Sequence, residues 1–199
     1  MSNFTDLIKQ RRTTYAIGNK TELTHEEIVD RIREIAQDVP SANNSQTTRV
    51  VVLFGEDNVK LWDHIYNVQK DVMQGPMWDM MSNVMQGAKG GVGTILFFED
   101  QGAIEKGIGK GARADVYKQH NDANMQYALW LGLAELGLGA SLQHMNIGFE
   151  QGFDKSIKEM FDLPENYEMI AQMPFGSIEA APGEKEYIDS NEQVRVIGE

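Results

Sequence analysis

The sequence contains no cysteine and has few basic residues for its length. Without cysteine the chain has no disulfide framework, no thiolate metal site and no thiol nucleophile, which fits a reducing compartment. Its 18 Lys and Arg face 30 Asp and Glu, a formal net charge of −12. Such a surface repels nucleic acid and anionic membranes, so we expect neither as a partner. An anionic ligand would need a local cluster of cations.

Long apolar runs and metal-ligand patterns are also missing. No apolar stretch approaches membrane-spanning length, and the first residues lack the apolar core of a signal peptide, so we expect a cytoplasmic protein. The four histidines, at positions 25, 64, 120 and 144, show no ligand spacing, so we expect no metal. Neither internal repeats nor a linker interrupt the 199 residues, which predicts one domain, 1–199.

A polar loop leads directly into a buried strand at residues 40–54. Residues 49–54 form a β-branched, apolar run that is typical of a strand covered on both faces. The loop before it is dense in amides and hydroxyls, among them Ser41, Asn44 and Gln46. A loop anchored by a core strand can hold binding groups in fixed positions. The alternative is a plain helix-to-strand connection whose side chains bond their own backbone, and composition alone favours it.

Apolar periodicity predicts helices and strands along the rest of the chain. The predicted helices are 3–11, 24–39, 58–70, 120–136 and 153–161, and the predicted strands are 49–54, 92–98 and 167–175. Thr24 and Glu27 form a capping box at the start of the second helix. Residues 99–113 read as a charged, glycine-rich surface stretch. Helix 120–136 is apolar on nearly all sides, which indicates a central position or a subunit interface.

Residues 71–91 hold five of the eleven methionines, together with Trp78 and four glycines. Methionine adapts its shape and contacts rings well, so this segment can line a pocket for a flat aromatic ligand. Trp78 and Met81 are the candidate substrate residues, and the Gly and Pro content suggests a lid. The alternative, favoured on composition, is that the methionines fill gaps in the core.

Three further segments carry candidate binding groups. Arg11-Arg12-Thr13 suits a phosphate, although cations at the end of a helix are also favoured by its free carbonyls. Gln143 and His144 follow directly after the buried helix, where polar groups either contact a ligand or are satisfied at the edge of the core. The apolar cluster 194–197 in the polar tail can pair as an edge strand with another chain.

The order of these motifs resembles the nitroreductase family of flavoproteins. The resemblance rests on four segments and spans nearly the whole chain: Arg11–Thr13, Pro40–Gln46, Gly137–His144, and Pro174–Gly176 through Pro182–Lys185. It looks closest to the small subfamily of fungal and bacterial nitroreductase-like proteins linked to copper stress and fatty-acid signalling.

The resemblance implies an α+β fold, a three-layer sandwich whose mostly antiparallel central sheet is flanked by helices. It implies a homodimer that holds FMN at the subunit interface, with residues 185–199 as an extended segment that reaches the partner subunit. The implied activity is FMN-dependent NAD(P)H oxidoreduction, in which nitroaromatic or quinone-type acceptors are reduced by ping-pong hydride transfer through flavin N5. The alternative is a flavin-binding sensor in stress or lipid signalling with little turnover.

The resemblance also assigns residues to the cofactor. It places Arg11, Arg12 and Thr13 at the phosphate and ribityl chain, with Lys185 as a further phosphate cation. It places Ser41, Asn44 and Gln46 at the flavin ring, typically that of the other subunit, and Gln143 and His144 along the isoalloxazine. No catalytic side chain is required, because FMN carries the chemistry. Thr47 stands where better-known members have proline, and basic residues are fewer, so the choice between NADH and NADPH stays open.

Overall fold

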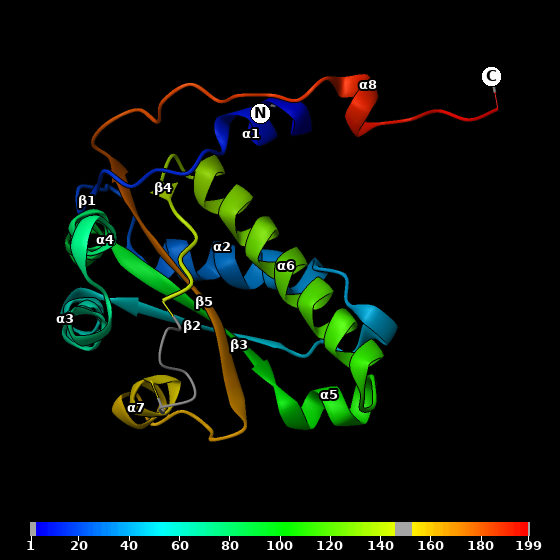
Figure 1. The fold of residues 1–199 in the computed structure, drawn as a ribbon, viewed down its shortest axis with the longest axis horizontal. Helices are drawn as coiled ribbons and strands as arrows, with labels where there is room; N and C mark the ends of the chain where they lie inside the picture. Colours follow the sequence, from blue (N-terminus) through cyan, green and yellow to red (C-terminus); the bar gives the residue numbers. More distant parts are fainter. Residues whose placement is uncertain (1–2, 146–152, 199) are drawn as a thin grey trace.

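The computed structural model describes residues 3–145 and 153–198 (Figure 1). A five-stranded sheet forms its middle layer, in the order β1-β5-β3-β2 with β4 beside β5, and every pairing is antiparallel. The strands are β1 (Ile17–Gly18), β2 (Thr48–Phe54), β3 (Gly93–Asp100), β4 (Gly139–Ala140) and β5 (Tyr167–Ile178). The predicted antiparallel α+β sandwich is therefore confirmed, with two short strands added to the three predicted.

Helices cover both faces of this sheet (Figure 1). They are α1 (Phe4–Gln10), α2 (His25–Asp38), α3 (Gly55–Val72), α4 (Gly75–Lys89), α5 (Gln101–Gly107), α6 (Ala112–Glu135), α7 (Phe153–Met160) and α8 (Ser190–Gln193). Helices α2 and α6 pack on one face, against Ile95, Phe97 and Met173. Helices α3, α4 and α7 pack on the other, against Leu96 and Phe98. Within the described ranges, none of the helices has the length and apolar character needed to cross a membrane.

The start of α2 follows the predicted capping box. The Glu27 amide donates to Thr24 Oγ1 at 3.2 Å, and Glu27 Oε2 accepts from the Thr24 amide at 2.7 Å. This reciprocal pair satisfies two of the backbone donors that a helix start leaves free. The prediction that this helix begins after Thr24 is confirmed.

Two predictions between residues 99 and 120 are wrong. Residues 99–113 are not merely a surface stretch, because they contain α5, whose first turn is capped when Asp100 Oδ1 accepts from the Ala103 amide at 3.1 Å. Helix α6 begins at Ala112 and not near residue 120. Its first two turns are charged and largely exposed, so they follow helix propensity without an apolar stripe that a periodicity argument can detect.

A buried polar network joins α3, α4 and β3. Trp62 Nε1 donates to Thr94 Oγ1 at 2.8 Å, and the Thr94 hydroxyl donates to Asn58 Oδ1 at 2.6 Å. The Asn58 amide donates in turn to the Ala88 carbonyl at 3.2 Å. Buried polar groups paired in this way specify one packing arrangement. The network fixes the methionine-rich segment as the regular helix α4, lying on the sheet.

Candidate functional site

The Arg11–Thr13 segment leaves α1 and runs beside β4. Thr13 forms an isolated parallel bridge with Ala140, and the Thr14 amide donates to the Ala140 carbonyl at 2.9 Å. Gln10 Nε2 donates to the Ala134 carbonyl at 3.1 Å, near the end of α6. The two arginines lie beside the end of α6 and beside Leu138 and Gly139, where β4 begins. The structure therefore brings together two of the motifs singled out in the sequence.

Arg11 is half-buried and holds an unused donor. Its guanidinium carbon lies 4.5 Å from the centroid of the Trp130 ring, a cation–π arrangement. Its Nε is buried without a hydrogen-bond partner among the residues described. A buried donor without an acceptor carries a desolvation cost of about 1–3 kcal/mol. The geometry therefore suits an added acceptor, such as an anionic oxygen.

Arg12 forms a hydrogen bond with the C-terminal tail and holds it beside the Arg11–Thr13 segment. Its Nη2 donates to the Gly183 carbonyl at 2.7 Å, a contact between positions 171 residues apart. Lys185 follows two residues later, exposed, with Nζ 5.0 Å from the centroid of the Tyr187 ring. The contact thus brings the segment that precedes Lys185 beside the two arginines, in a chain whose net charge is −12.

Gln143 is buried and hydrogen-bonded within the fold, whereas His144 is exposed. Gln143 is buried, its backbone exchanges hydrogen bonds with Gln172 at 2.7 and 2.9 Å, and its Nε2 donates to Ser141 Oγ at 3.0 Å. Its own amide N–H is therefore occupied. His144 is exposed, yet nearby protein atoms desolvate the ring and lower its pKa below the ordinary 6.5. At neutral pH His144 is uncharged.

The polar loop is held in a strained backbone conformation. Asn43, Asn44 and Gln46 have φ values of 55°, 51° and 46°, in the left-handed region that non-glycine residues rarely adopt. The Gln46 amide donates to Ser41 Oγ at 3.0 Å, and Gln46 Nε2 donates to Asn44 Oδ1 at 3.1 Å. Each such residue costs about 1–3 kcal/mol, and strain of this kind clusters at functional sites.

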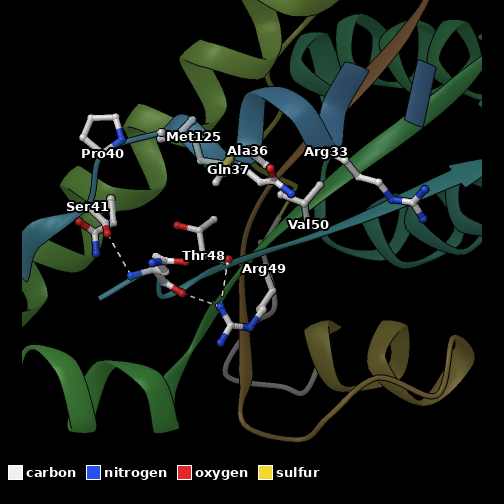
Figure 2. Close-up of a pocket in the computed structure, with 12 residues that line it drawn as sticks. Arg33, Ala36, Gln37, Pro40, Ser41, Thr48, Arg49, Val50 and Met125 are labelled. Atoms are coloured by element: carbon white, nitrogen blue, oxygen red, sulfur yellow. Dashed lines mark hydrogen bonds between the residues drawn. The ribbon is translucent and has the colours of Figure 1, made fainter. Parts of the chain in front are cut away.

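The loop borders a cavity of about 370 Å³ beside β2 (Figure 2). Its wall is apolar, from Ala36, Val50 and Met125, and Arg33 and Arg49 lie along its rim. Arg49 Nη1 donates to the Gln46 carbonyl at 2.6 Å and its Nη2 to Asp100 at 2.9 Å. The guanidinium of Arg49 therefore stabilises the loop through these bonds and is poorly placed to bind a ligand anion.

Asn121 on α6 anchors the loop from behind, and sequence reasoning did not single it out. It is buried, its Oδ1 accepts from the Ala42 amide at 2.8 Å, and its Nδ2 donates to Ser45 Oγ at 3.1 Å and Thr47 Oγ1 at 3.0 Å. Gly107 closes the loop from another side, because a Cβ there would lie 2.7 Å from Ser45 Cβ. The sequence carries no clear signal for this role, because Asn121 stands in the polar run 118–122.

A buried acidic cluster lies beside this anchor. Gln126 Nε2 donates to one oxygen of Asp122, and Thr48 Oγ1 donates to Glu99 Oε1 at 2.6 Å. The other oxygen of each carboxyl is buried without a partner in the described part of the chain. Burial, and then the charge of Glu99, raises the pKa of Asp122 to about 7. Burial also raises the pKa of Glu99, and the hydroxyls of Thr47 and Thr48, followed by the charge of Lys118, offset part of this rise.

Trp78 and Met81 lie on α4, half-buried against the second core cluster. The Trp78 ring meets that of Tyr66 with centroids 4.9 Å apart. Helix α4 approaches the Arg-Arg-Thr segment at Gly87, where a Cβ would lie 3.1 Å from the Tyr15 carbonyl. Nine residues of helix separate Gly87 from Trp78, which is about 14 Å along the axis.

The predicted site residues form two groups within one chain. Arg11, Arg12 and Thr13 lie near β4 and the end of α6, with Gln143 and His144 a few residues after β4 and Lys185 two residues after Gly183. Ser41, Asn44 and Gln46 lie where Asn121 holds the loop. The first group is nearest to Ala134 on α6, and the second is nearest to Asn121. These two residues lie about 20 Å apart along the helix axis, because an α-helix rises 1.5 Å per residue. Figure 1 shows β4 near one end of α6.

Comparison with known proteins places the chain in a family. The nitroreductase family model matches residues 8–177. Nitroreductase CinD from Lactococcus lactis, solved in complex with chloramphenicol, is 33% identical with a TM-score of 0.84, over 98% of this chain and all of that one. The putative nitroreductase HBN1 of Saccharomyces cerevisiae is 28% identical over 98% of this chain and 97% of its own length. The chain belongs to the nitroreductase family.

A more distant structure shares the fold. A putative nitroreductase from Desulfovibrio desulfuricans, solved in complex with FMN, is 20% identical with a TM-score of 0.69, over the whole of this chain and 99% of that one. The predicted nitroreductase-like fold is confirmed, and family membership supports a flavin oxidoreductase in general terms.

We expect Asp122→Asn to change how stability depends on pH. The folded chain keeps a proton on Asp122 that the unfolded chain loses above 3.8, so stability falls as pH rises from about 4 to about 7. The isosteric amide removes this loss, worth up to about 1.4 kcal/mol per pH unit. Urea unfolding at pH 5, 6, 7 and 8 should show the variant gaining on the wild type as pH rises.

Asp115→Asn is the matched control, because Asp115 lies on the same helix and is exposed. Its stability profile should run parallel to that of the wild type. Parallel profiles for Asp122→Asn as well would contradict the buried proton.

Proposed function

We propose that this chain is an FMN-dependent NAD(P)H oxidoreductase that reduces nitroaromatic or quinone-type acceptors. Family membership supports the flavin chemistry. CinD, 30–33% identical, has been solved with chloramphenicol, with 4-nitrophenol and with nicotinic acid, which supports nitro compounds as acceptors and a nicotinamide donor. The contact between Arg12 and the Gly183 carbonyl is the main structural support for the proposal. It brings the segment before Lys185 beside Arg12, where a phosphate is expected.

The residues near β4 fit the phosphate end of FMN. The unpartnered Nε of Arg11 offers a donor, and Arg12 and Lys185 supply positive charge in an otherwise acidic protein. Charge-assisted hydrogen bonds from guanidinium to phosphate are among the strong ones in proteins. The hydroxyl of Thr13, in the same segment, is the candidate for the ribityl chain.

The remaining residues are proposed to hold the flavin ring. His144, exposed and uncharged, and the backbone around Gln143 lie along it, and Ser41, Asn44 and Gln46 approach from the second subunit. Bound FMN would supply hydride chemistry at N5, taken from NAD(P)H and passed to an acceptor in alternate half-reactions. The chain's own part is to bind and orient the ring and leave one face open to both substrates.

A homodimer would bring the two groups of residues together. Strand β2 is the edge of the sheet, and its side chains Val50, Val52 and Phe54 line a groove of about 670 Å³ with α2. The tail leaves Val194, Val196 and Ile197 exposed at 67%, 64% and 87%. We propose that this segment of residues 185–199 pairs with β2 of the partner, as an extended peptide adds to a sheet edge; Glu199 itself lies outside the described residues.

Trp78 and Met81 remain the proposed substrate residues. Trp78 is half-buried and its ring contacts that of Tyr66 at an interplanar angle of 58°, so the ring is held in place while part of it stays accessible. An aromatic acceptor seated on the flavin can contact such a ring edge or face.

The first experiment is the visible absorption spectrum of the purified protein, followed by titration of the apoprotein with FMN. We expect flavin bands and about one FMN per chain. Arg12→Ala should weaken FMN binding at least about tenfold, because it removes a charge-assisted hydrogen bond. Riboflavin, which lacks the phosphate, should bind both forms equally. Arg113→Ala, an exposed arginine that donates to the Tyr117 hydroxyl at 2.8 Å, should leave the binding of both flavins unchanged.

A protein that stays colourless and takes up no added FMN would refute the proposal. When FMN is bound, rapid bleaching by NADH or NADPH and recovery on adding 4-nitrophenol or a quinone supports the oxidoreductase. Tight binding with little turnover instead supports the flavin-binding sensor.

We expect Trp78→Ala to raise KM for a nitroaromatic acceptor and to leave the rate of flavin reduction by NAD(P)H unchanged. The ring is proposed to contact the acceptor alone, so only that half-reaction should respond. Met77→Ala is the control, since Met77 is exposed on the same helix. Unchanged acceptor KM and kcat in Trp78→Ala would exclude this role.

Val196→Asp should convert a dimer into a monomer and weaken flavin binding at the same time. A charge inserted into the proposed strand pairing is costly to desolvate, and without the partner the ring loses the polar loop. Analytical ultracentrifugation measures the first effect and flavin titration the second. Val72→Asp, an exposed valine at the end of α3 on the other side of the sheet, should change neither. A dimeric Val196→Asp that binds FMN normally excludes this pairing.

A further inference from the structure

Asn121 uses every hydrogen-bonding group of its side chain on the polar loop. An asparagine amide has one carbonyl oxygen and two N–H donors. Here the oxygen accepts from Ala42, and the nitrogen donates to Ser45 and to Thr47, all between 2.8 and 3.1 Å. Only 2% of the residue is exposed. Asn121 therefore has no group left for a ligand, and any effect it has on binding passes through the loop.

The loop has internal hydrogen bonds, such as that from the Gln46 amide to Ser41 Oγ, but its backbone is strained. Between Ala42 and Thr48 it contains neither glycine nor proline, yet three of its residues adopt left-handed φ values. Asparagine tolerates that region better than glutamine, so Gln46 is the most demanding of the three. A backbone that is strained on its own must be held by its surroundings, and Asn121 supplies three of the bonds that hold it.

The anchored residues alternate with the proposed flavin contacts. Asn121 bonds Ser45 and Thr47, and Thr47 is fully buried. Asn44 and Gln46, which lie beside them in sequence, are exposed and bonded to each other at 3.1 Å. The loop thus presents one set of side chains to α6 and another outward (Figure 2 shows Ser41 and Thr48 at its two ends).

We propose that Asn121 is a positioning residue for the flavin, acting through Ser45 and Thr47 to hold Ser41, Asn44 and Gln46 in their binding arrangement. The inference rests on the proposed FMN binding and goes beyond it, because it assigns affinity for the ring to a residue that the ring never touches. An Asn121 that served only the core would change stability and leave the bound flavin as it is.

The test is titration of the full-length apoprotein with FMN and with riboflavin, together with the visible circular dichroism of the bound flavin. Asn121→Ala should raise Kd at least about tenfold for both flavins, because it releases three hydrogen bonds that order the ring-binding loop. The ratio of the two Kd values should stay at the wild-type value, since the phosphate contacts near β4 are intact. The circular dichroism band should change shape.

Gln119→Ala is the matched control. Gln119 carries an exposed side-chain amide on the same helix, two residues before Asn121. This variant should bind both flavins as the wild type does.

Thr47→Val keeps the inference testable if Asn121→Ala folds poorly, because it removes one partner hydroxyl and preserves volume. It should weaken the binding of both flavins, but by less than Asn121→Ala does. Where both single variants fold, the double variant should raise the flavin Kd by less than the product of the two single increases. This is expected of residues that act through one contact.

Normal binding of both flavins by folded Asn121→Ala or Thr47→Val would overturn the positioning role and leave the proposed function intact. A wild-type protein that binds no flavin would overturn both.

Discussion

Helix α6 lies across one face of the sheet, with Met125, Leu129 and Leu133 packed in the same core cluster as Phe97 and Met173. This contact determines where the functional segments can be. The far end of α6 accepts the hydrogen bond from Gln10 and stacks Trp130 on Arg11, and its middle anchors the polar loop through Asn121. The helix therefore fixes the separation of the two groups of proposed binding residues, and a change in its register would move both.

Charge imposes a second constraint on the chain. Several of its few basic side chains form ion pairs within the chain, such as Arg49 with Asp100, Lys118 with Glu168 and Arg31 with Glu135. Surface pairs of this kind add little stability, but the half-buried ones hold loops and strand ends in place. The arginines at the end of α1 differ, because Arg12 bonds a neutral carbonyl and Arg11 a pair of aromatic rings. Their charge remains available to an anion.

Much of the fold was predictable, because its signals are local. The capping box at Thr24 and the strand at residues 49–54 depend on neighbouring residues, and both are confirmed. The predicted burial of that strand on both faces is wrong, because β2 is an edge strand in which only Leu53 is buried. The motif order predicted the family. By contrast, the first turns of α6 lack an apolar stripe, and β1 and β4 are two-residue pairings that exist only because β5 lies beside them. Asn121 and Asp122 were missed for a similar reason, since burial of a polar side chain is decided by distant segments. The site residues carried over from the family stay predictions, grouped by the structure but not tested by it.

The exposed tail has a consequence for aggregation of the chain. Val194, Val196 and Ile197 form a short β-prone segment that has no cover within one subunit, and β2 offers an open edge. While they stay uncovered, both are sites where unrelated chains can add strands and aggregate. The tail carries Glu184, Glu186, Asp189 and Glu192 just ahead of this segment, and charges in such flanks act as gatekeepers against aggregation. The acidity of the tail thus lowers the risk of aggregation at a segment that is otherwise prone to it.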